Sequence, residues 1–260
     1  MRNFQIRLPP LEEQQRIVSI LDEAFENIEN SNEQVQSKLN DVGILFQTSL
    51  DAAFVNDDWN RATLEEILLV QPRNGWSPPA AYHSDAGTPV LTLSSVTGNV
   101  FRADRYKFTS APVDFQRHYW VKNGDFLITR SNTPKLVGHV AIASDITTPT
   151  IYSDLIMRMN PDNEKVLTKF LYYQMRTTLL REEITGRAKG ANPTMVKINK
   201  GSVQSIPISF PPLGQQQIII DNIEQLSQFT QKLELTYDKE LSALTELKQS
   251  ILQEAFNGTL

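Results

Sequence analysis

The side chains that could do chemistry in this sequence gather in three short stretches, 73–77, 130–135 and 187–200. Arginine and lysine can hydrogen-bond to guanine in the major groove of DNA, and asparagine can pair with adenine. Serine, threonine and backbone amides can hold phosphates. Each stretch could also be an ordinary solvent-exposed loop. The candidate DNA-contacting residues are Arg73, Asn74, Trp76, Ser77, Arg130, Ser131, Asn132, Thr133, Lys135, Arg187, Lys189, Asn192, Lys197 and Lys200.

The charge of the chain bears on this chemistry in two opposite ways. The net charge of −5 argues against nucleic acid, because proteins that bind it usually present a basic surface. The stretch 187–200, however, holds four basic residues and no acidic one. The acidic total therefore hides a basic patch.

Catalytic and metal-binding motifs are not apparent in the sequence. Cysteine is absent, and His83, His118 and His139 stand apart, without the spacing of metal ligands. An adenine methyltransferase needs a glycine-rich cofactor loop and an Asn/Asp-Pro-Pro-aromatic motif that holds a flipped base. Residues 192–195 read NPTM, which lacks the second proline and the aromatic residue. We therefore expect no catalytic residue, no metal and no bound cofactor in this chain.

The sequence contains an internal repeat, and its two copies lie on either side of the candidate DNA-contacting stretches. Residues 8–17, LPPLEEQQRI, return as residues 210–219, FPPLGQQQII, at an offset of 202. The offset holds without a gap over the next forty residues, so that Leu39 falls on Leu241. Each proline pair ends an extended segment, and a helix can start there, because proline is tolerated in a first helical turn.

Each copy predicts one long helix whose apolar residues recur at steps of three and four. This spacing forms a narrow seam, typical of a helix that pairs with another helix. The first helix, Leu11 to Phe54, would be about 65 Å long at about 1.5 Å per residue. The simplest packing is an antiparallel coiled-coil arm. The predicted seam consists of Ile17, Leu21, Ile28, Val35, Leu39, Val42, Leu45, Ile223, Leu226, Leu233, Leu241, Leu244, Leu247 and Ile251.

Between the two helices, the pattern predicts one mixed domain of about 150 residues. A capping box at 63–66 predicts a short helix, and 164–184 has a helical pattern. Strands are predicted at 90–93, 126–129, 136–143, 151–159 and 206–210, and a flexible basic loop at 186–193. The fold class is α+β. Its parts are an N-terminal helical region at 1–56, the mixed domain at 57–209 and a C-terminal helical region at 210–260.

These features together resemble the specificity subunit of type I restriction-modification systems. The resemblance covers nearly the whole chain and rests first on Pro9–Val18 and its copy Pro211–Ile219. Weaker landmarks of the family's target-recognition domain lie between the copies: Trp59 with Leu64, Gly124–Leu127, Gly138–Ala141 and Ile206–Ile208.

The resemblance implies a non-catalytic, sequence-specific DNA-binding subunit. In the family, each recognition domain reads one half of a split double-stranded DNA target, and the conserved helices space two such domains. A separate modification subunit methylates adenine with S-adenosylmethionine, and a separate restriction subunit cleaves. The expected partners are therefore double-stranded DNA, the modification subunit and, through the complex, the restriction subunit.

This sequence contains both helices but only one recognition domain. Ile6–Leu8 looks like the last strand of a missing domain, so the chain resembles a half subunit. It could be a natural single-domain protein, the product of a truncated gene, or a fragment. A homodimer through the helices would restore two-domain geometry and read a palindromic split site.

Two alternatives stay open: a stand-alone DNA-modifying enzyme, and a protein-binding scaffold that no longer reads DNA. Tight binding of S-adenosylmethionine would favour the first. Capture of a modification subunit without any binding of DNA would favour the second. The sequence has no run of eighteen apolar residues, no signal-peptide pattern and no cysteine, so we expect a cytoplasmic protein without a membrane segment.

Overall fold

The computed structural model describes residues 9–192 and 194–259 and shows a mixture of helices and strands. The chain divides into two compact units, one formed by Met1–Thr48 with Glu224–Leu260 and the other by Ser49–Ile223. The predicted α+β class is confirmed. The strand predicted at Ile6–Leu8 lies outside the described residues.

Two long helices dominate the fold, α1 (Leu11–Ala53, 43 residues) and α6 (Leu213–Asn257, 45 residues). Each follows a proline pair, and each agrees with the sequence prediction to within a residue or two. Glu12 and Glu13 lie in the first turn of α1, where negative charge stabilises the helix dipole. Gly258, with φ of +72°, follows the last turn of α6.

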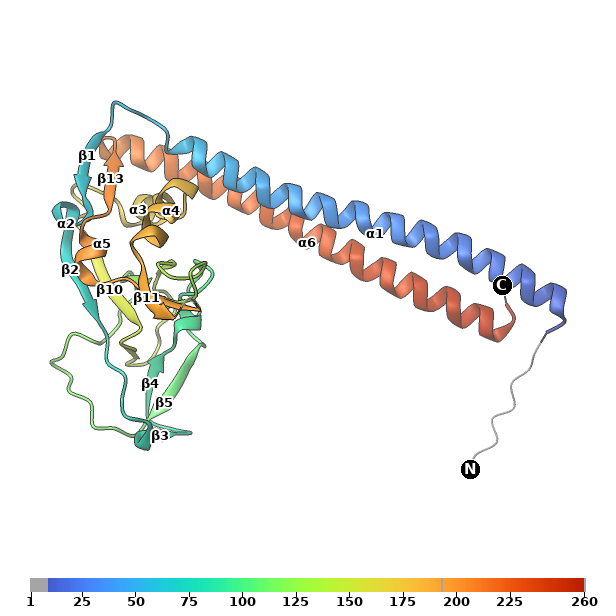
Figure 1. Cartoon of the computed structure of the whole chain (residues 1–260), viewed down its shortest axis with the longest axis horizontal. Helices are drawn as coiled ribbons and strands as arrows, with labels where there is room; N and C mark the ends of the chain where they lie inside the picture. The colour runs from blue at the N-terminus through green and yellow to red at the C-terminus, as the bar shows by residue number, and fades with distance from the viewer. Residues whose placement is uncertain (1–8, 193, 260) are drawn as a thin grey trace. The chain divides into compact units, whose positions relative to one another are not determined.

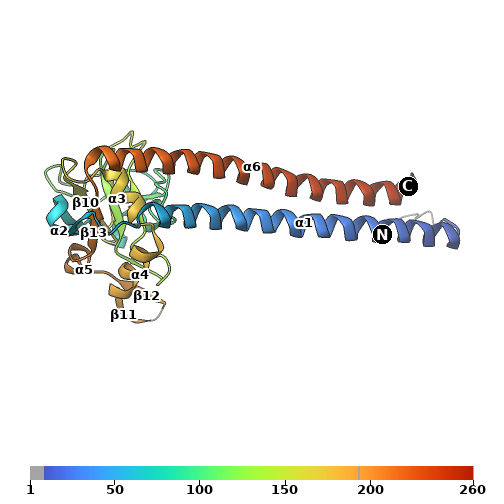
Figure 2. The same cartoon turned by 90° about the horizontal axis from the view of Figure 1, so that it is seen from above.

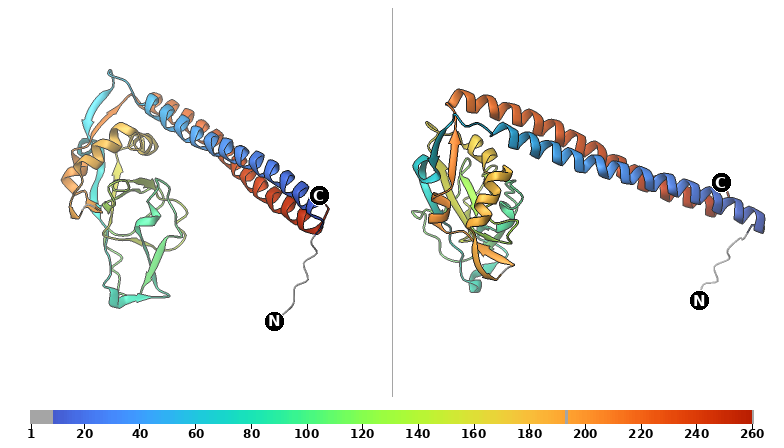
Figure 3. Two further views of the ribbon diagram at one scale, coloured as in Figure 1. Left: turned by 45° about the vertical axis from the view of Figure 1, so that its right-hand side comes forward. Right: turned by 45° about the horizontal axis from the view of Figure 1, so that its top comes forward.

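Within the helical unit, α1 and α6 run antiparallel and side by side (Figures 1 and 2). The Lys38 ammonium lies 5.8 Å from the ring centroid of Tyr237, and the Lys248 ammonium lies 5.1 Å from that of Phe25. As the residue number rises along α1, the number of the contacting residue on α6 therefore falls, which is the order expected of antiparallel helices. The helices remain side by side in both views of Figure 3, so the predicted antiparallel arm is present.

Two of the predicted seam residues, Leu45 and Leu247, are wrong. Their exposed fractions are 46% and 47%, and they occupy equivalent positions of the two copies. In α1 the seam residue that follows Val42 is Phe46, which lies four residues further on and is half-buried. The predicted residue, Leu45, lies only three residues further on. An α-helix has 3.6 residues per turn, so a strict alternation of three and four drifts off the seam. The other predicted seam residues are buried or half-buried.

The mixed domain is built from short elements. Its helices are α2 (Leu64–Ile67), α3 (Thr168–Gln174), α4 (Thr178–Arg187) and α5 (Lys200–Gln204). Its 3₁₀ turns are η1 (Ala80–Tyr82) and η2 (Leu93–Ser95). Its strands are β1 (Asn60–Thr63), β2 (Leu68–Asn74), β3 (His83–Ser84), β4 (Thr88–Leu91), β5 (Tyr106–Thr109), β6 (Phe126–Thr129), β7 (Ser131–Asn132), β8 (Val140–Ile142), β9 (Ile151–Tyr152), β10 (Ile156–Pro161), β11 (Lys189–Asn192), β12 (Met195–Lys197) and β13 (Pro207–Phe210).

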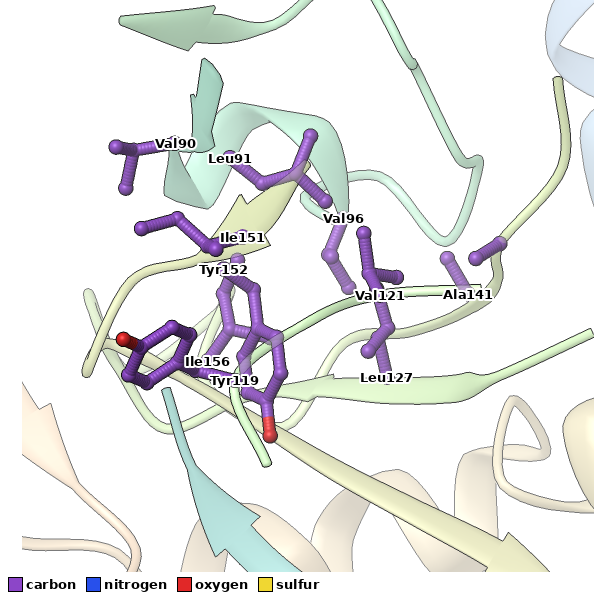
Figure 4. Packing of buried hydrophobic residues seen from close by; sticks show 11 residues of the cluster. Val90, Leu91, Val96, Tyr119, Val121, Leu127, Ala141, Ile151, Tyr152 and Ile156 are labelled. Carbon is purple, nitrogen blue, oxygen red and sulfur yellow. The ribbon is translucent and has the colours of Figure 1, made fainter. Parts of the chain in front are cut away.

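The strands form four small sheets. Their orders are β2-β10-β6-β8, β3-β5-β4-β9, β11-β12-β7 and β1-β13. The pairings are antiparallel except that of β4 with β9. Side chains from β4, β6, β8 and β9 point toward one another and enclose a core with the rings of Tyr119 and Tyr152 (Figure 4). This core fixes the loops that carry the candidate residues.

Several predicted elements are broken where the chain changes direction. The strand predicted at 151–159 is two strands, because the chain leaves one sheet after β9 and enters another at β10. The strand predicted at 90–93 ends at Leu91, and the one predicted at 136–143 shrinks to β8. Gly138 explains why the strand predicted at 136–143 is shorter. Its φ of +73° is not that of an extended strand, and a Cβ at this position would lie 2.2 Å from Ile184 Cγ2.

The helix predicted at 164–184 is two helices, α3 and α4. Thr177 separates them, because its side chain caps α4 by accepting a hydrogen bond from the backbone N–H of Leu180. The flexible loop predicted at 186–193 is wrong over its described part. Arg187 ends α4, and β11 follows as one strand of a hairpin with β12.

Candidate nucleic-acid interface

The three-stranded sheet joins the second and third candidate stretches. Strand β12 pairs with β11 on one side and with β7 on the other. In the β12–β7 register, Lys197 lies opposite Ser131 and Val196 opposite Asn132. The Ile198 N–H donates to the Arg130 carbonyl at 2.9 Å and extends this contact. Two stretches more than fifty residues apart in sequence therefore form one surface.

The first stretch reaches the same region through Asp154. The Ser77 hydroxyl donates to Asp154 Oδ1 at 2.5 Å, and Arg130 Nη1 lies 3.4 Å from the Asp154 carbonyl oxygen. The Arg130 N–H donates to the carbonyl of Leu155 at 2.8 Å. The link between β9 and β10 thus holds the first and second stretches together.

Gly75 makes this approach possible. A Cβ at this position would lie 1.9 Å from the Tyr152 carbonyl oxygen, which no side chain could tolerate. The Gly75 N–H donates to Ile156 and the Trp76 N–H to Tyr152. The first stretch is consequently pressed backbone to backbone against the β9–β10 link.

The β11–β12 hairpin presents two lysines opposite one another. Lys189 and Lys197 are cross-strand partners, and both are exposed, as is Lys200 at the start of α5. Within the part of the chain that the structure describes, none of the three has an acidic partner. Like charges directly opposite in a sheet repel each other, and an anion between them would relieve that repulsion. The hairpin is therefore suited to a phosphate.

Three candidates have side-chain partners inside the domain, and a fourth is buried with no hydrogen-bond partner for its hydroxyl among the described residues. The Trp76 ring stacks on Tyr119, with centroids 5.4 Å apart, and Ser77 is held by Asp154 as described above. Ser131 is buried. Arg187 forms an ion pair with Glu183 and hydrogen-bonds to Ser205. As placed, these side chains support the loops.

The remaining described candidates face solvent to different degrees. Arg73, Asn74, Thr133 and Lys135 are exposed, whereas Arg130 is half-buried. Asn132 is also half-buried, and its Nδ2 lies 3.2 Å from Thr97 Oγ1. The side chain of Asn192 lies outside the described residues. The exposed positions and the three lysines of the hairpin and α5 are the ones free to reach a ligand.

Arg181 is a positioning residue that the sequence did not reveal. Its Nη2 donates to the carbonyls of Lys135 and Val137, at 3.2 and 2.8 Å, and so holds the end of the second stretch. Burial lowers the pKa of its guanidinium. It lies in a segment with a helical pattern, where an arginine ordinarily indicates a solvent-facing side.

His139 buttresses the same region as a neutral imidazole. Its Nδ1 accepts a hydrogen bond from the Gly98 N–H at 2.9 Å. Burial, followed by the positive charge of Arg181, lowers the pKa of His139 to about 4. The protonated form is disfavoured both by the loss of hydration and by this neighbouring charge.

The landmark at 124–127 has a structural explanation in a buried network around Asp125. One carboxylate oxygen accepts from the Lys122 N–H at 2.8 Å and from Arg158 Nη1 at 3.2 Å. The other accepts from Asn160 Nδ2 at 2.9 Å. The side chains of Arg158 and Asp125 are only 16% and 7% exposed. This ion pair fixes the start of β6 against β10.

The charge of the chain is divided between its parts. Residues 57–209 hold 18 lysines and arginines against 14 aspartates and glutamates. Residues 1–56 and 210–260 together hold 7 against 16. The acidic total thus comes from the long helices, and the mixed domain is net positive.

The second copy of the proline-glutamine motif holds the domain through Gln216. This side chain is fully buried. Its Nε2 donates to the carbonyls of Pro211 and Lys165, at 2.8 and 2.9 Å, and its Oε1 accepts from the Leu167 N–H at 2.8 Å. Gln216 therefore fastens the start of α6 to the segment before α3.

The first copy repeats only one of these contacts. Gln14, which corresponds to Gln216, donates from Nε2 to the Pro9 carbonyl at 2.7 Å. Within the described chain, its Oε1 accepts no hydrogen bond. Over the described residues, the first copy thus repeats the Gln216–Pro211 contact of the second copy but not its contacts with Lys165 and Leu167.

Neither a metal-ion cluster nor a membrane-spanning helix is found among the described residues. Over residues 9–192 and 194–259, no three histidine, aspartate or glutamate residues come together as a metal ion would require. None of the described helices combines the length and apolarity needed to cross a bilayer. In the near-miss methyltransferase motif, Asn192 and Met195 form the last pair of the β11–β12 hairpin.

Comparison with known proteins identifies the family. A model of the type I restriction modification DNA specificity domain matches residues 1–41 and 56–243. The chain belongs to this family. Among curated relatives, the EcoKI specificity subunit of Escherichia coli (strain K12) is 24% identical over 273 residues, which are 99% of this chain and 58% of that protein. The EcoDI specificity subunit of Escherichia coli is 32% identical over 102 residues, 39% of this chain and 22% of that protein.

Solved structures agree with the family. One, described as the structural basis of complex assembly and conformational transition of the type I R-M system, matches with a TM-score of 0.78 and 25% identity. The match covers 98% of this chain and 62% of that chain. The HsdS subunit of Thermoanaerobacter tengcongensis shares the fold, with a TM-score of 0.59, 24% identity and coverage of 98% and 61%. This chain thus spans about three fifths of the relatives it matches end to end.

Proposed function

We propose that this chain is a non-catalytic recognition component of a type I restriction-modification system. Residues 57–209 bind double-stranded DNA and read one half of a split target. The helices bind the modification subunit and, through the complex, the restriction subunit. The observation that carries the proposal is that three separate polar and basic stretches are held together within one net-positive domain.

The chemistry of that surface divides into positioning and reading. The opposed lysines Lys189 and Lys197 suit a phosphate, which would fix the domain on the duplex. Arg73 and Asn74 at the end of β2 can reach base edges, because arginine pairs with guanine and asparagine with adenine. Asp154 could accept a hydrogen bond from cytosine in the same groove. Phosphate contacts supply affinity, and base contacts supply sequence preference.

Salt dependence of binding tests this function. Fluorescence anisotropy of a labelled random-sequence duplex should show a strong loss of affinity between about 50 and 200 mM salt. Replacing both Lys189 and Lys197 with alanine should reduce the logarithmic salt slope by about 1 for every phosphate that is no longer neutralised. Lys239→Ala, an exposed lysine on α6, is the matched control and should leave the slope unchanged. Affinity that does not vary with salt would reject the proposed contacts.

The partner subunit is proposed to carry the methylation chemistry. S-adenosylmethionine would bind to the modification subunit, and this chain would bind no cofactor. Calorimetry should therefore detect no binding of S-adenosylmethionine to the isolated chain, whereas the co-purified complex should methylate adenine. Tight binding by the chain alone would support a stand-alone enzyme. A chain that binds the modification subunit but no DNA would be a scaffold.

A second recognition domain is needed to read the other half of a split site. Gln14 is the proposed contact for that domain, because Gln216 at the equivalent position holds the backbone of Lys165 and Leu167. A homodimer through the helices is the simplest source of a second domain. The seam is already closed between α1 and α6, so a dimer would use side chains outside it, Leu45 and Leu247 among them.

A further inference from the structure

A rigid turn in the mixed domain carries an exposed aromatic ring. Phe115 is 75% exposed, although its turn is held from two directions. The Asp114 N–H donates to the Tyr119 hydroxyl at 2.8 Å, and Trp120 Nε1 donates to the Asp114 carbonyl at 3.0 Å. Asp114 Oδ1 also accepts from the Gln116 N–H at 2.9 Å. A ring presented in this way loses little conformational freedom when it binds a partner.

The ring is one half of an aromatic stack. Phe115 and Trp120 lie parallel, with an interplanar angle of 3° and centroids 4.9 Å apart. Trp120 is half-buried. One face of the Phe115 ring is therefore covered, and the exposed area leaves room for another flat ring. Nucleobases stack on aromatic side chains in this manner, whatever their sequence.

The surroundings of this ring are polar and basic. Arg117 lies in the same turn, where its Nε is 3.4 Å from Asp114 Oδ2. Gln116 and Arg117 next to Phe115 are exposed. A surface for a protein partner would present contiguous apolar area. A single aromatic ring among basic and amide side chains fits nucleic acid better.

The turn is also tied to the first candidate stretch. His118 Nε2 lies 2.9 Å from the Asn74 carbonyl oxygen, and Tyr119 stacks on Trp76. Arg73 and Asn74 at the end of β2 therefore share one rigid support with the turn that carries Phe115. A duplex bound at the end of β2 would lie close to this ring.

We propose that Phe115 stacks on a base of the bound duplex that has been separated from its neighbour. This inference rests on the proposed DNA-binding function and extends it from reading base edges to deforming the duplex. Apolar side chains that enter a base step unstack it and kink the helix, and the cost depends on the sequence of that step. Phe115 would thereby contribute to target choice without a hydrogen bond to a base.

The test uses the full chain with duplexes that it selects from a random-sequence pool. Adenines of a selected duplex are replaced one at a time by 2-aminopurine, whose fluorescence rises when it is unstacked. Wild-type protein should raise the signal at one position. Phe115→Ala should abolish that rise and weaken binding about 5- to 150-fold, because base–aromatic stacking contributes on this scale. Phe115→Trp should restore both. Leu179→Ala is the matched control, since Leu179 is equally exposed on α4, and it should change neither.

The outcomes separate the inference from the function on which it rests. If wild-type protein selects no duplex, the proposed DNA binding fails. If Phe115→Ala keeps both the signal and the affinity, DNA binding stands and the stacking role is overturned. If Phe115→Ala binds the duplex normally but loses the modification subunit, the ring belongs to a protein interface, which also overturns it. Thermal unfolding of each variant checks that the turn still folds.

Discussion

At the scale of single residues, Asp125 is the side chain whose removal should cost the domain most. Asp125→Ala would leave Arg158 as a buried charge without its partner, and such losses typically cost about 3–5 kcal/mol. The three tryptophans of the chain lie in residues 57–209, so tryptophan fluorescence during urea unfolding reports on this domain. Asp85→Ala, at an exposed site, should change the midpoint little. Equal effects of the two variants would contradict the importance of the network.

His139 makes the stability of the domain depend on pH. Its pKa is lowered to about 4 in the folded state, so the unfolded chain takes up the proton first as pH falls. The stabilisation is complete above about pH 6.5 and is lost as pH falls toward 4. Because the ring is only partly buried and solvent screens the neighbouring charge, on the order of 1 kcal/mol should disappear between pH 6.5 and 4.5. In His139→Gln, whose side-chain oxygen can still accept from Gly98, urea unfolding should show a smaller loss over this range. An unchanged pH dependence would refute the assignment.

At the scale of elements, the seam of the arm can be tested with two neighbouring apolar residues. Val42 is buried, whereas Leu45 is largely exposed. Val42→Ala should destabilise the helical unit by about 1–2 kcal/mol, because less apolar surface would be buried. Leu45→Ala should stay within about 0.5 kcal/mol, as surface substitutions usually do. Thermal unfolding followed by ellipticity at 222 nm, to which the two long helices contribute most, would distinguish them. A larger loss of stability in Leu45→Ala than in Val42→Ala would show that Leu45 belongs to the seam, as the sequence predicted.

The long helices could be predicted from sequence because their information is local and written twice. The small sheets could not. Strand β2 includes Pro72, which reads as a turn, but β2 is an edge strand, where a missing N–H is tolerated. Its partner β10 lies more than eighty residues away, and no periodicity reveals such a pairing. The same holds for the β12–β7 contact that joins two candidate stretches.

The sequence supplied the residue types of the candidate site but not their arrangement. The sequence indicated that Lys189, Lys197 and Arg187 lie in one basic stretch. It could not show that the two lysines face each other while Arg187 turns to Glu183. Arg181 and Phe115 gave no signal, because an arginine in a helical pattern and a phenylalanine in a polar loop are common in any protein.

At the scale of the whole molecule, the division of charge should guide association with DNA. A net-positive domain attracts the polyanion, and the acidic helices repel it. The acidic surface that the helices present would then remain available to protein partners. A chain with a net charge of −5 can bind DNA on these terms, provided that its basic residues share one surface.

If the mixed domain reads one half of a split target, as proposed, the oligomeric state decides where the other half is read. If two copies pair through the outer surfaces of their helices, light scattering over a concentration range should show a mass rising from 29.5 kDa toward twice that value. Replacing both Leu45 and Leu247 with aspartate should shift the rise to higher concentration, because it removes apolar side chains from that surface. These residues lie outside the seam, so the arm itself should unfold at an unchanged temperature. A mass of one chain at every concentration would reject the homodimer. The Gln14 contact would then be made with a domain other than that of a second copy, and Gln14→Ala would weaken that contact without changing the stability of the isolated chain.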